Sequence, residues 1–206
     1  MKLNWANRIT ILRILLIAPF IIAMLRINDT ALSINTRYLL RYIATAIFLI
    51  MAISDGIDGC IARKTHTVTR LGSFLDPTAD KLLMTSACIL LASTKAHVVG
   101  FKLDTAIAVL IIGKDIFLLL GFLIMYFITF RVKIIPVFIG KVSTASQLIM
   151  VAGTLMAPEI AKIVPNWIWI LRFIWWTTAI TAIFTTLIYI RNGSRYIAEY
   201  EQSPTQ

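Results

Sequence analysis

Acidic residues are scarce in this 206-residue chain, which has ten aspartates and glutamates against twenty lysines and arginines. A net charge of +10 has two common uses, the binding of nucleic acid and contact with anionic lipid headgroups. The chain has no soluble basic stretch that would carry nucleic acid, so we expect no nucleic-acid partner. The two cysteines and two histidines lack the spacing of a metal site, which argues against a cysteine–histidine metal centre.

Long polar stretches are also scarce, because 59% of the residues are hydrophobic, whereas a soluble domain is about half apolar. The apolar residues form runs near the ~20 residues that cross a bilayer as a helix. These runs lack the alternation of apolar and polar residues that is typical of a transmembrane barrel. The sequence shows no internal repeat, no low-complexity tract and no domain boundary. It therefore predicts an all-α polytopic membrane protein with a single domain over residues 1–206.

Six apolar runs predict a bundle of six transmembrane helices, preceded by a short interfacial segment at residues 1–8 that contains one tryptophan. The second helix is expected to continue past the bilayer edge to Arg63. The third helix begins either at Asp76, with Pro77 in its first turn, or near Gly72, with the proline inside a longer helix. The six runs cover roughly residues 9–25, 38–53, 76–91, 105–127, 143–156 and 167–190.

An even number of spans places both termini on the same side of the membrane. If that side is the cytoplasm, its loops carry more lysine and arginine than the opposite loops, as the positive-inside rule requires. We therefore expect an integral protein of the cell or inner membrane. Both termini and the segment 54–81 would then lie on the cytoplasmic side.

Four of the ten acidic residues lie within residues 54–81. Asp55 and Asp58 are three positions apart, and Asp76 and Asp80 are four apart, so each pair occupies one face of a helix. A short connection makes consecutive helices antiparallel neighbours, which lets the two pairs meet. Carboxylate oxygens are the ligands that Mg²⁺ and Mn²⁺ prefer. We therefore expect these four aspartates to hold one or two such ions, and two ions could together bind a diphosphate.

Solvated helix ends, cation transport and prenyl transfer each account for less of this pattern. Solvation at a helix end would explain one aspartate, but not two pairs in matching register beside an arginine. A divalent-cation transporter would also need carboxylates in the membrane, yet it gives no reason for Ala62, Arg63 and Gly72 at their spacings. An intramembrane prenyltransferase needs two separate aspartate-rich motifs, and this chain has one.

The same residues resemble the signature of the CDP-alcohol phosphatidyltransferases, which reads D-x2-D-G-x2-A-R-x8-G-x3-D-x3-D. The opening sequence NRITILRILLIAP also resembles that family's N-x2-T-x2-R motif. The two resemblances together cover nearly the whole chain. Every fixed position of the signature is present, as Asp55, Asp58, Gly59, Ala62, Arg63, Gly72, Asp76 and Asp80.

This resemblance implies transfer of a phosphatidyl group from CDP-diacylglycerol to an acceptor hydroxyl, with release of CMP. It implies that Asp55, Asp58 and Asp76 hold two divalent ions, with Asp80 contributing to the site. Asp80 would also be the general base that takes the proton from the acceptor. The resemblance further implies a homodimer. The residues that would bind CDP-diacylglycerol are Gly59, Ala62, Arg63, Gly72, Asn7, Thr10 and Arg13.

The signature is shared across the family and does not select the acceptor alcohol. Arg131, Lys133 and Lys141 could bind an acceptor phosphate, or they could be ordinary basic loop residues. The stretch FIGKVSTASQLIMVAGTLMAP resembles the glycerophospholipid branch, which contains phosphatidylglycerophosphate synthases and CMP-forming cardiolipin synthases. The fourth run, GKDIFLLLGFLIMYF, lacks the A-L-R sequence usual in the former. We therefore expect phosphatidylglycerol as acceptor and cardiolipin as product, with glycerol 3-phosphate as the alternative acceptor.

Two charged residues, Lys114 and Asp115, interrupt the fourth apolar run. Charged side chains inside a membrane usually face the interior of a bundle and pair with another charge. We expect these two to pair with each other or with the aspartate site. The sequence does not choose between these two arrangements.

Overall fold

The computed structural model describes the backbone of residues 5–65, 70–129 and 138–202, and the side chains of residues 11–54, 78–121, 123 and 138–194. Within these ranges the chain forms seven helices and no strand, as an all-α protein requires. The helices are α1 (Trp5–Arg26), α2 (Ile34–Thr65), α3 (Arg70–Ala92), α4 (Thr105–Thr129), α5 (Phe138–Leu155), α6 (Ala157–Ile163) and α7 (Trp167–Gln202).

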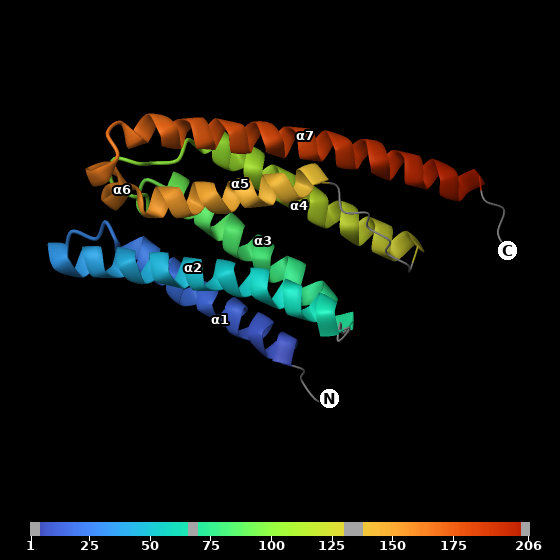
Figure 1. Cartoon of the computed structure of the whole chain (residues 1–206), viewed down its shortest axis with the longest axis horizontal. Coiled ribbons are helices and arrows are strands. Elements are labelled where there is room, and N and C mark those ends of the chain that lie inside the picture. Colours follow the sequence, from blue (N-terminus) through green and yellow to red (C-terminus); the bar gives the residue numbers. More distant parts are fainter. Residues whose placement is uncertain (1–4, 66–69, 130–137, 203–206) are drawn as a thin grey trace.

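The long helices form a bundle in which consecutive members run in opposite directions (Figure 1). α1 packs against α2 and α3, α3 packs against α4, and α7 packs against both α4 and α5. The start of α1, the end of α2, the start of α3 and the end of α7 lie at one end of the bundle, whereas α6 lies at the other (Figure 1). The bundle therefore brings both ends of the chain to the end where α2 passes into α3.

The six predicted runs correspond to α1–α5 and α7, but several boundaries differ. α2 continues as one helix to Thr65, which confirms the expected extension past Arg63. α3 begins at Arg70, so Pro77 lies inside a longer helix, an arrangement that membrane proteins tolerate. The predicted separate interfacial segment is wrong from Trp5 onward, because these residues already belong to α1. α7 likewise extends into the predicted polar tail, since polar side chains at a helix end can remain in helical conformation while their heads reach water.

Three helical segments of the described residues are long and apolar enough to cross a membrane: Ile34–Ser54, Phe138–Leu155 and Trp167–Ser194. Large apolar side chains along α7 point outward, and Trp169 and Phe173 are 65% and 69% exposed. Such outward apolar surface suits a bundle surrounded by lipid tails, which are as apolar as leucine. The structure therefore supports a helical membrane protein, and six spans stay a prediction.

The core fixes the face of α3 that precedes and follows Asp80. Ala79, Leu83, Met84 and Ala87 are all at most 2% exposed, and the last three belong to one apolar cluster with residues of α1 and α2. Their spacing of three and four positions makes a continuous stripe along α3. Because this stripe is packed against two other helices, Asp80 lies on a well-supported helix.

A charged pair joins α2 to α6 at the end of the bundle that lies away from the α2–α3 connection (Figure 1). The Arg41 guanidinium donates to both carboxylate oxygens of Glu159, and it also donates to the Leu155 carbonyl oxygen at 3.2 Å. The Tyr42 hydroxyl donates to Glu159 at 3.0 Å. The hydrogen bond from Arg41 holds the pKa of the Glu159 carboxyl below its ordinary value. The Arg41–Glu159 pair therefore fixes the short helix α6 to the bundle.

We expect Glu159→Ala to lower the free energy of unfolding by about 3 kcal/mol, because it leaves the Arg41 guanidinium uncompensated while the Arg41 side chain is only 8% exposed. Arg41→Met should cost less, since the Glu159 side chain is 32% exposed and water can reach its carboxylate. Unfolding in detergent micelles measures both, with the exposed α6 residue Lys162 changed to alanine as a control. Equal losses in the two variants would contradict this assignment.

The same pair predicts a dependence of stability on pH. Because folding lowers the pKa of Glu159, its contribution is fully present above the ordinary carboxyl pKa. It is lost as the pH falls through the lower pKa of the folded state. Glu159→Gln should remove this acid-dependent part of the unfolding free energy.

Candidate functional site

The signature residues lie where α2 ends and α3 begins, at one end of the bundle (Figure 1). Five of them are on α2 and three are on α3, so each acidic pair stands on a helix as its spacing predicts. Among these eight residues the structure describes the side chain of Asp80 alone, and a contact between the acidic pairs stays a prediction. The seven whose side chains lie outside the described part are Asp55, Asp58, Gly59, Ala62, Arg63, Gly72 and Asp76.

The opening motif lies on α1, the helix that packs against both α2 and α3. Arg13 is only 3% exposed and therefore points into the bundle. The side chains of Asn7 and Thr10 lie outside the described part of the chain. α1 thus places the motif beside the two helices that carry the aspartates, as a role in the same site requires.

The expected acceptor-binding residues are only partly described. Lys141 lies in the first turn of α5 and is exposed. Arg131 and Lys133 lie outside the described residues. The structure thus places Lys141 on an accessible surface, and the grouping of the three basic residues stays a prediction.

Asp80 has a partly exposed carboxylate on α3. Its side chain is 21% exposed, and its Oδ2 lies 4.0 Å from the Nζ of Lys81. The preceding residue, Ala79, is fully buried in the core. Asp80 thus stands at the margin of the bundle core, where a substrate can approach one side while a fixed ammonium group occupies the other.

A buried polar network connects this margin to α4 and α5. Lys81 Nζ donates to Asp115 Oδ1 at 2.8 Å, and Lys114 Nζ lies 3.2 Å from the same oxygen. Gln147 Nε2 donates to the second oxygen, Asp115 Oδ2, at 3.0 Å. Lys114 Nζ also donates to Gln147 Oε1 at 3.1 Å and to Ser143 Oγ at 3.3 Å. Both oxygens of Asp115 are therefore engaged, and three helices meet at one carboxylate.

The charges of this network do not cancel among its own members. Lys81 and Lys114 carry two positive charges against the one negative charge of Asp115, and the side chains of Lys114 and Asp115 are 2% and 1% exposed. Unpaired charge in a low-dielectric interior is costly. The neighbouring Asp80 carboxylate supplies the balancing negative charge. The network and Asp80 thus form one electrostatic unit.

Sequence reasoning expected Lys114 and Asp115 to pair with each other or with the aspartate site, and the structure shows both. Their mutual contact is 3.2 Å, and Lys81 links Asp115 to Asp80. Ser143 and Gln147 were missed. Their signal was present, because two polar residues four positions apart share a face of an otherwise apolar helix.

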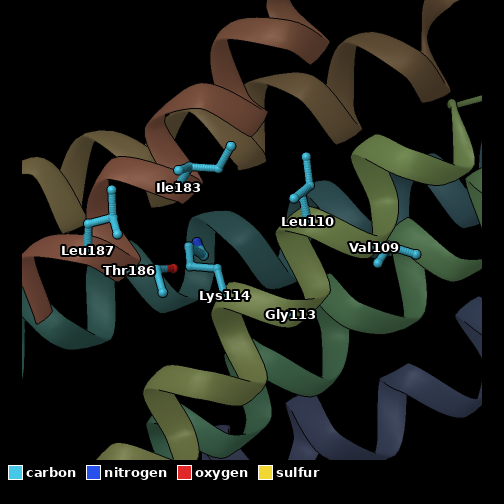
Figure 2. Close-up of a pocket in the computed structure, with 7 residues that line it drawn as sticks. All are labelled: Val109, Leu110, Gly113, Lys114, Ile183, Thr186 and Leu187. Carbon is cyan, nitrogen blue, oxygen red and sulfur yellow. The ribbon is translucent and has the colours of Figure 1, made fainter. Parts of the chain in front are cut away.

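Lys114 also borders a groove of about 250 Å³ between α4 and α7 (Figure 2). Its other lining residues are Val109, Leu110, Gly113, Ile183, Thr186 and Leu187. The lining has few polar atoms that would orient a charged substrate. The lysine covers apolar surface with its carbon chain while its ammonium group joins the network. We therefore assign no phosphate chemistry to this groove.

Divalent ions suit the donor set of the signature, which consists of carboxylates from two helices. Hard cations such as Mg²⁺ take oxygen ligands of this kind, and the one described carboxylate, Asp80, is accessible. The described residues alone contain no group of three possible metal ligands. The full set therefore depends on the three aspartates whose side chains lie outside the described part of the chain.

Comparison with known proteins identifies the family. A family model described as CDP-alcohol phosphatidyltransferase matches residues 3–188. The CDP-diacylglycerol–glycerol-3-phosphate 3-phosphatidyltransferase of Bacillus subtilis is 36% identical over 156 residues, which are 74% of this chain and 77% of that protein. The enzyme of the same name from Haemophilus influenzae is 33% identical over 180 residues, covering 85% and 90% of the two chains.

A CMP-forming cardiolipin synthase of Oryza sativa is 36% identical over 110 residues, but these are 50% of this chain and 33% of that protein. The relatives thus come from the glycerophospholipid branch that the sequence resembles. The match to the family model spans both the opening motif and the complete signature. This chain belongs to the CDP-alcohol phosphatidyltransferase family.

Proposed function

We propose that this phosphatidyltransferase uses glycerol 3-phosphate as its acceptor and forms phosphatidylglycerophosphate and CMP from CDP-diacylglycerol. One observation carries this proposal. Relatives named for this reaction align over 74% and 85% of the chain, whereas the cardiolipin synthase aligns over 50%. The comparisons therefore favour the alternative acceptor over phosphatidylglycerol, which we expected first.

The position of the apolar run in α4 explains why it was a poor guide to the acceptor. Phe117 and Leu120, within the sequence that replaces the A-L-R run, are 42% and 52% exposed. Apolar side chains on the outside of a membrane bundle contact lipid tails whatever the substrate is. The charged pair at Lys114 and Asp115 is the part of this run that points inward. The run thus reports on the surroundings of α4 more than on the acceptor site.

The proposed reaction begins with the acceptor hydroxyl near Asp80. The Asp80 carboxylate takes the hydroxyl proton as the oxygen attacks the β-phosphorus of CDP-diacylglycerol. A bond forms between that oxygen and the β-phosphorus, and the bond to the bridging oxygen of the CMP group breaks. Arg63, whose guanidinium is suited to phosphate oxygens, offsets negative charge on the diphosphate. CMP then leaves with the bridging oxygen.

We propose that Asp55, Asp58, Asp76 and Asp80 hold Mg²⁺ or Mn²⁺, which when bound neutralises charge on the diphosphate. The acceptor carries a phosphomonoester, which needs cationic partners of its own. Lys141 is accessible for that role, and we assign Arg131 and Lys133 to it with Lys141. As the family resemblance implies, we also propose a homodimer whose active site faces the cytoplasm.

The acceptor is tested with purified protein, radiolabelled CDP-diacylglycerol and four separate acceptors. These are glycerol 3-phosphate, phosphatidylglycerol, inositol phosphate and serine. We expect phosphatidylglycerophosphate from glycerol 3-phosphate, with one CMP released for each product molecule. Thin-layer analysis of the lipid product and measurement of CMP give both readouts.

A reaction without acceptor is the control for hydrolysis of CDP-diacylglycerol. Cardiolipin formed from phosphatidylglycerol, with no product from glycerol 3-phosphate, would overturn the proposed acceptor. Absence of CMP release with every acceptor would instead favour a divalent-cation transporter. Lys141→Ala should lower turnover with either glycerol acceptor, so it tests the site and not the choice of acceptor.

A further inference from the structure

The ammonium group of Lys81 lies between two carboxylates from different helices. Neighbouring side chains on a helix do not face each other, so the sequence position of Lys81 does not by itself bring it to Asp80. Its Nζ is nevertheless 2.8 Å from Asp115 Oδ1 and 4.0 Å from Asp80 Oδ2. The side chain is thus drawn across to α4 and held in contact with Asp80 at the same time.

Asp115 is a firm anchor for this arrangement. Its side chain is 1% exposed, and its second oxygen accepts the hydrogen bond from Gln147 at 3.0 Å. A lysine has a flexible stem of four carbons and loses considerable rotamer freedom when it is fixed. A carboxylate that is itself held by a second helix fixes the lysine more sharply than solvent would.

We propose that Lys81 is a positioning residue for Asp80, and that Asp115 is the anchor that holds Lys81 in place. This inference rests on the role of Asp80 in the proposed function. The fixed ammonium group occupies one side of the Asp80 carboxylate and restricts its rotation. The other side of the carboxylate is then directed to the acceptor hydroxyl.

A purely structural role for the network makes a different prediction. In that case the two lysines would only neutralise buried charge, and either one could be lost at the same cost. Removal of Lys81 or of Lys114 leaves one ammonium group against Asp115. The two variants are therefore matched in charge, and they differ in that Lys81 contacts Asp80.

The experiment compares Lys81→Met with Lys114→Met. We expect Lys81→Met to lower kcat by about 10–100-fold, the usual effect of losing a partner that orients a site carboxylate. Its KM for CDP-diacylglycerol should change by less than about threefold, because substrate binding is not what it removes. Lys114→Met should lower kcat by less than about threefold, since Gln147 and Lys81 still hold Asp115. Melting temperatures in detergent should be similar for the two variants.

Two further variants sharpen the result. Lys81→Arg keeps a positive charge of similar reach, so it should recover most of the lost kcat. Lys81→Gln keeps a hydrogen-bond donor without the charge, and it replaces the methionine variant if that protein does not fold. Equal kcat losses in Lys81→Met and Lys114→Met would overturn the inference, as would wild-type kcat in Lys81→Gln.

Failure of the inference is distinguishable from failure of the proposed function. The wild-type protein is first assayed with each acceptor, and the lysine variants are then compared with whichever acceptor it uses. Transfer to phosphatidylglycerol would therefore change the proposed acceptor and leave the lysine comparison intact. Asp80→Asn is assayed alongside, and wild-type kcat in that variant would overturn both the role of Asp80 and the positioning role of Lys81.

Discussion

Removal of divalent cations with EDTA is expected to abolish phosphatidyl transfer, and added Mg²⁺ or Mn²⁺ is expected to restore it. Metal ions contribute several kcal/mol of charge stabilisation in such reactions, so we expect a loss of at least about a thousandfold. The signature supplies four carboxylates within residues 54–81, and without cations their mutual repulsion would oppose the approach of a diphosphate. CMP release measures the effect.

The control for this experiment is EDTA added as its magnesium complex, which has the same chemistry without free chelating capacity. Helix content from circular dichroism separates loss of the ions from loss of the fold. Full turnover in excess chelator, with the fold intact, would contradict the metal-dependent mechanism. Restoration by Mg²⁺ alone or by Mn²⁺ alone would identify which ion the site accepts.

The helices were predictable because the bilayer imposes both their length and their composition. Boundaries were harder, since polar sequence such as Asn7-Arg8 continues the helix of an adjacent apolar run. The short helix α6 was missed because its seven residues are too few for a span. Pro77 left two starts open for α3, and the structure chose the longer helix.

The site was predictable as far as local spacing reaches. Periodicity on one helix places Asp76 and Asp80 on a common face, and it also relates Ser143 to Gln147. It does not reveal that Lys81 meets Asp115, 34 positions later, or that Arg41 meets Glu159 across 118 positions. Those contacts depend on which helices pack together, and many pairings of six apolar helices satisfy the same hydrophobic pattern.

Asp80→Asn is expected to lower kcat by about 10²–10⁴-fold, the range that a positioned general base contributes. Asparagine keeps the shape of the side chain but cannot accept the proton of the acceptor hydroxyl. The fold should survive, because Lys81 keeps its hydrogen bond to Asp115 at 2.8 Å and the Asp80 side chain is already 21% exposed. KM for CDP-diacylglycerol should change little, since the lost interaction belongs to the transition state.

The matched variant is Asp55→Asn, which removes a carboxylate of the other acidic pair. It should also abolish turnover, but it should weaken metal binding as well, because Asp55 is proposed as a ligand without a separate role in proton transfer. The rise in melting temperature on titration with Mn²⁺ measures metal binding independently of turnover. We expect this titration to shift to higher Mn²⁺ concentration in Asp55→Asn and to stay near the wild-type curve in Asp80→Asn. An equal shift in the two variants would show that Asp80 acts chiefly as a ligand, and the general base would then have to be sought elsewhere in the site.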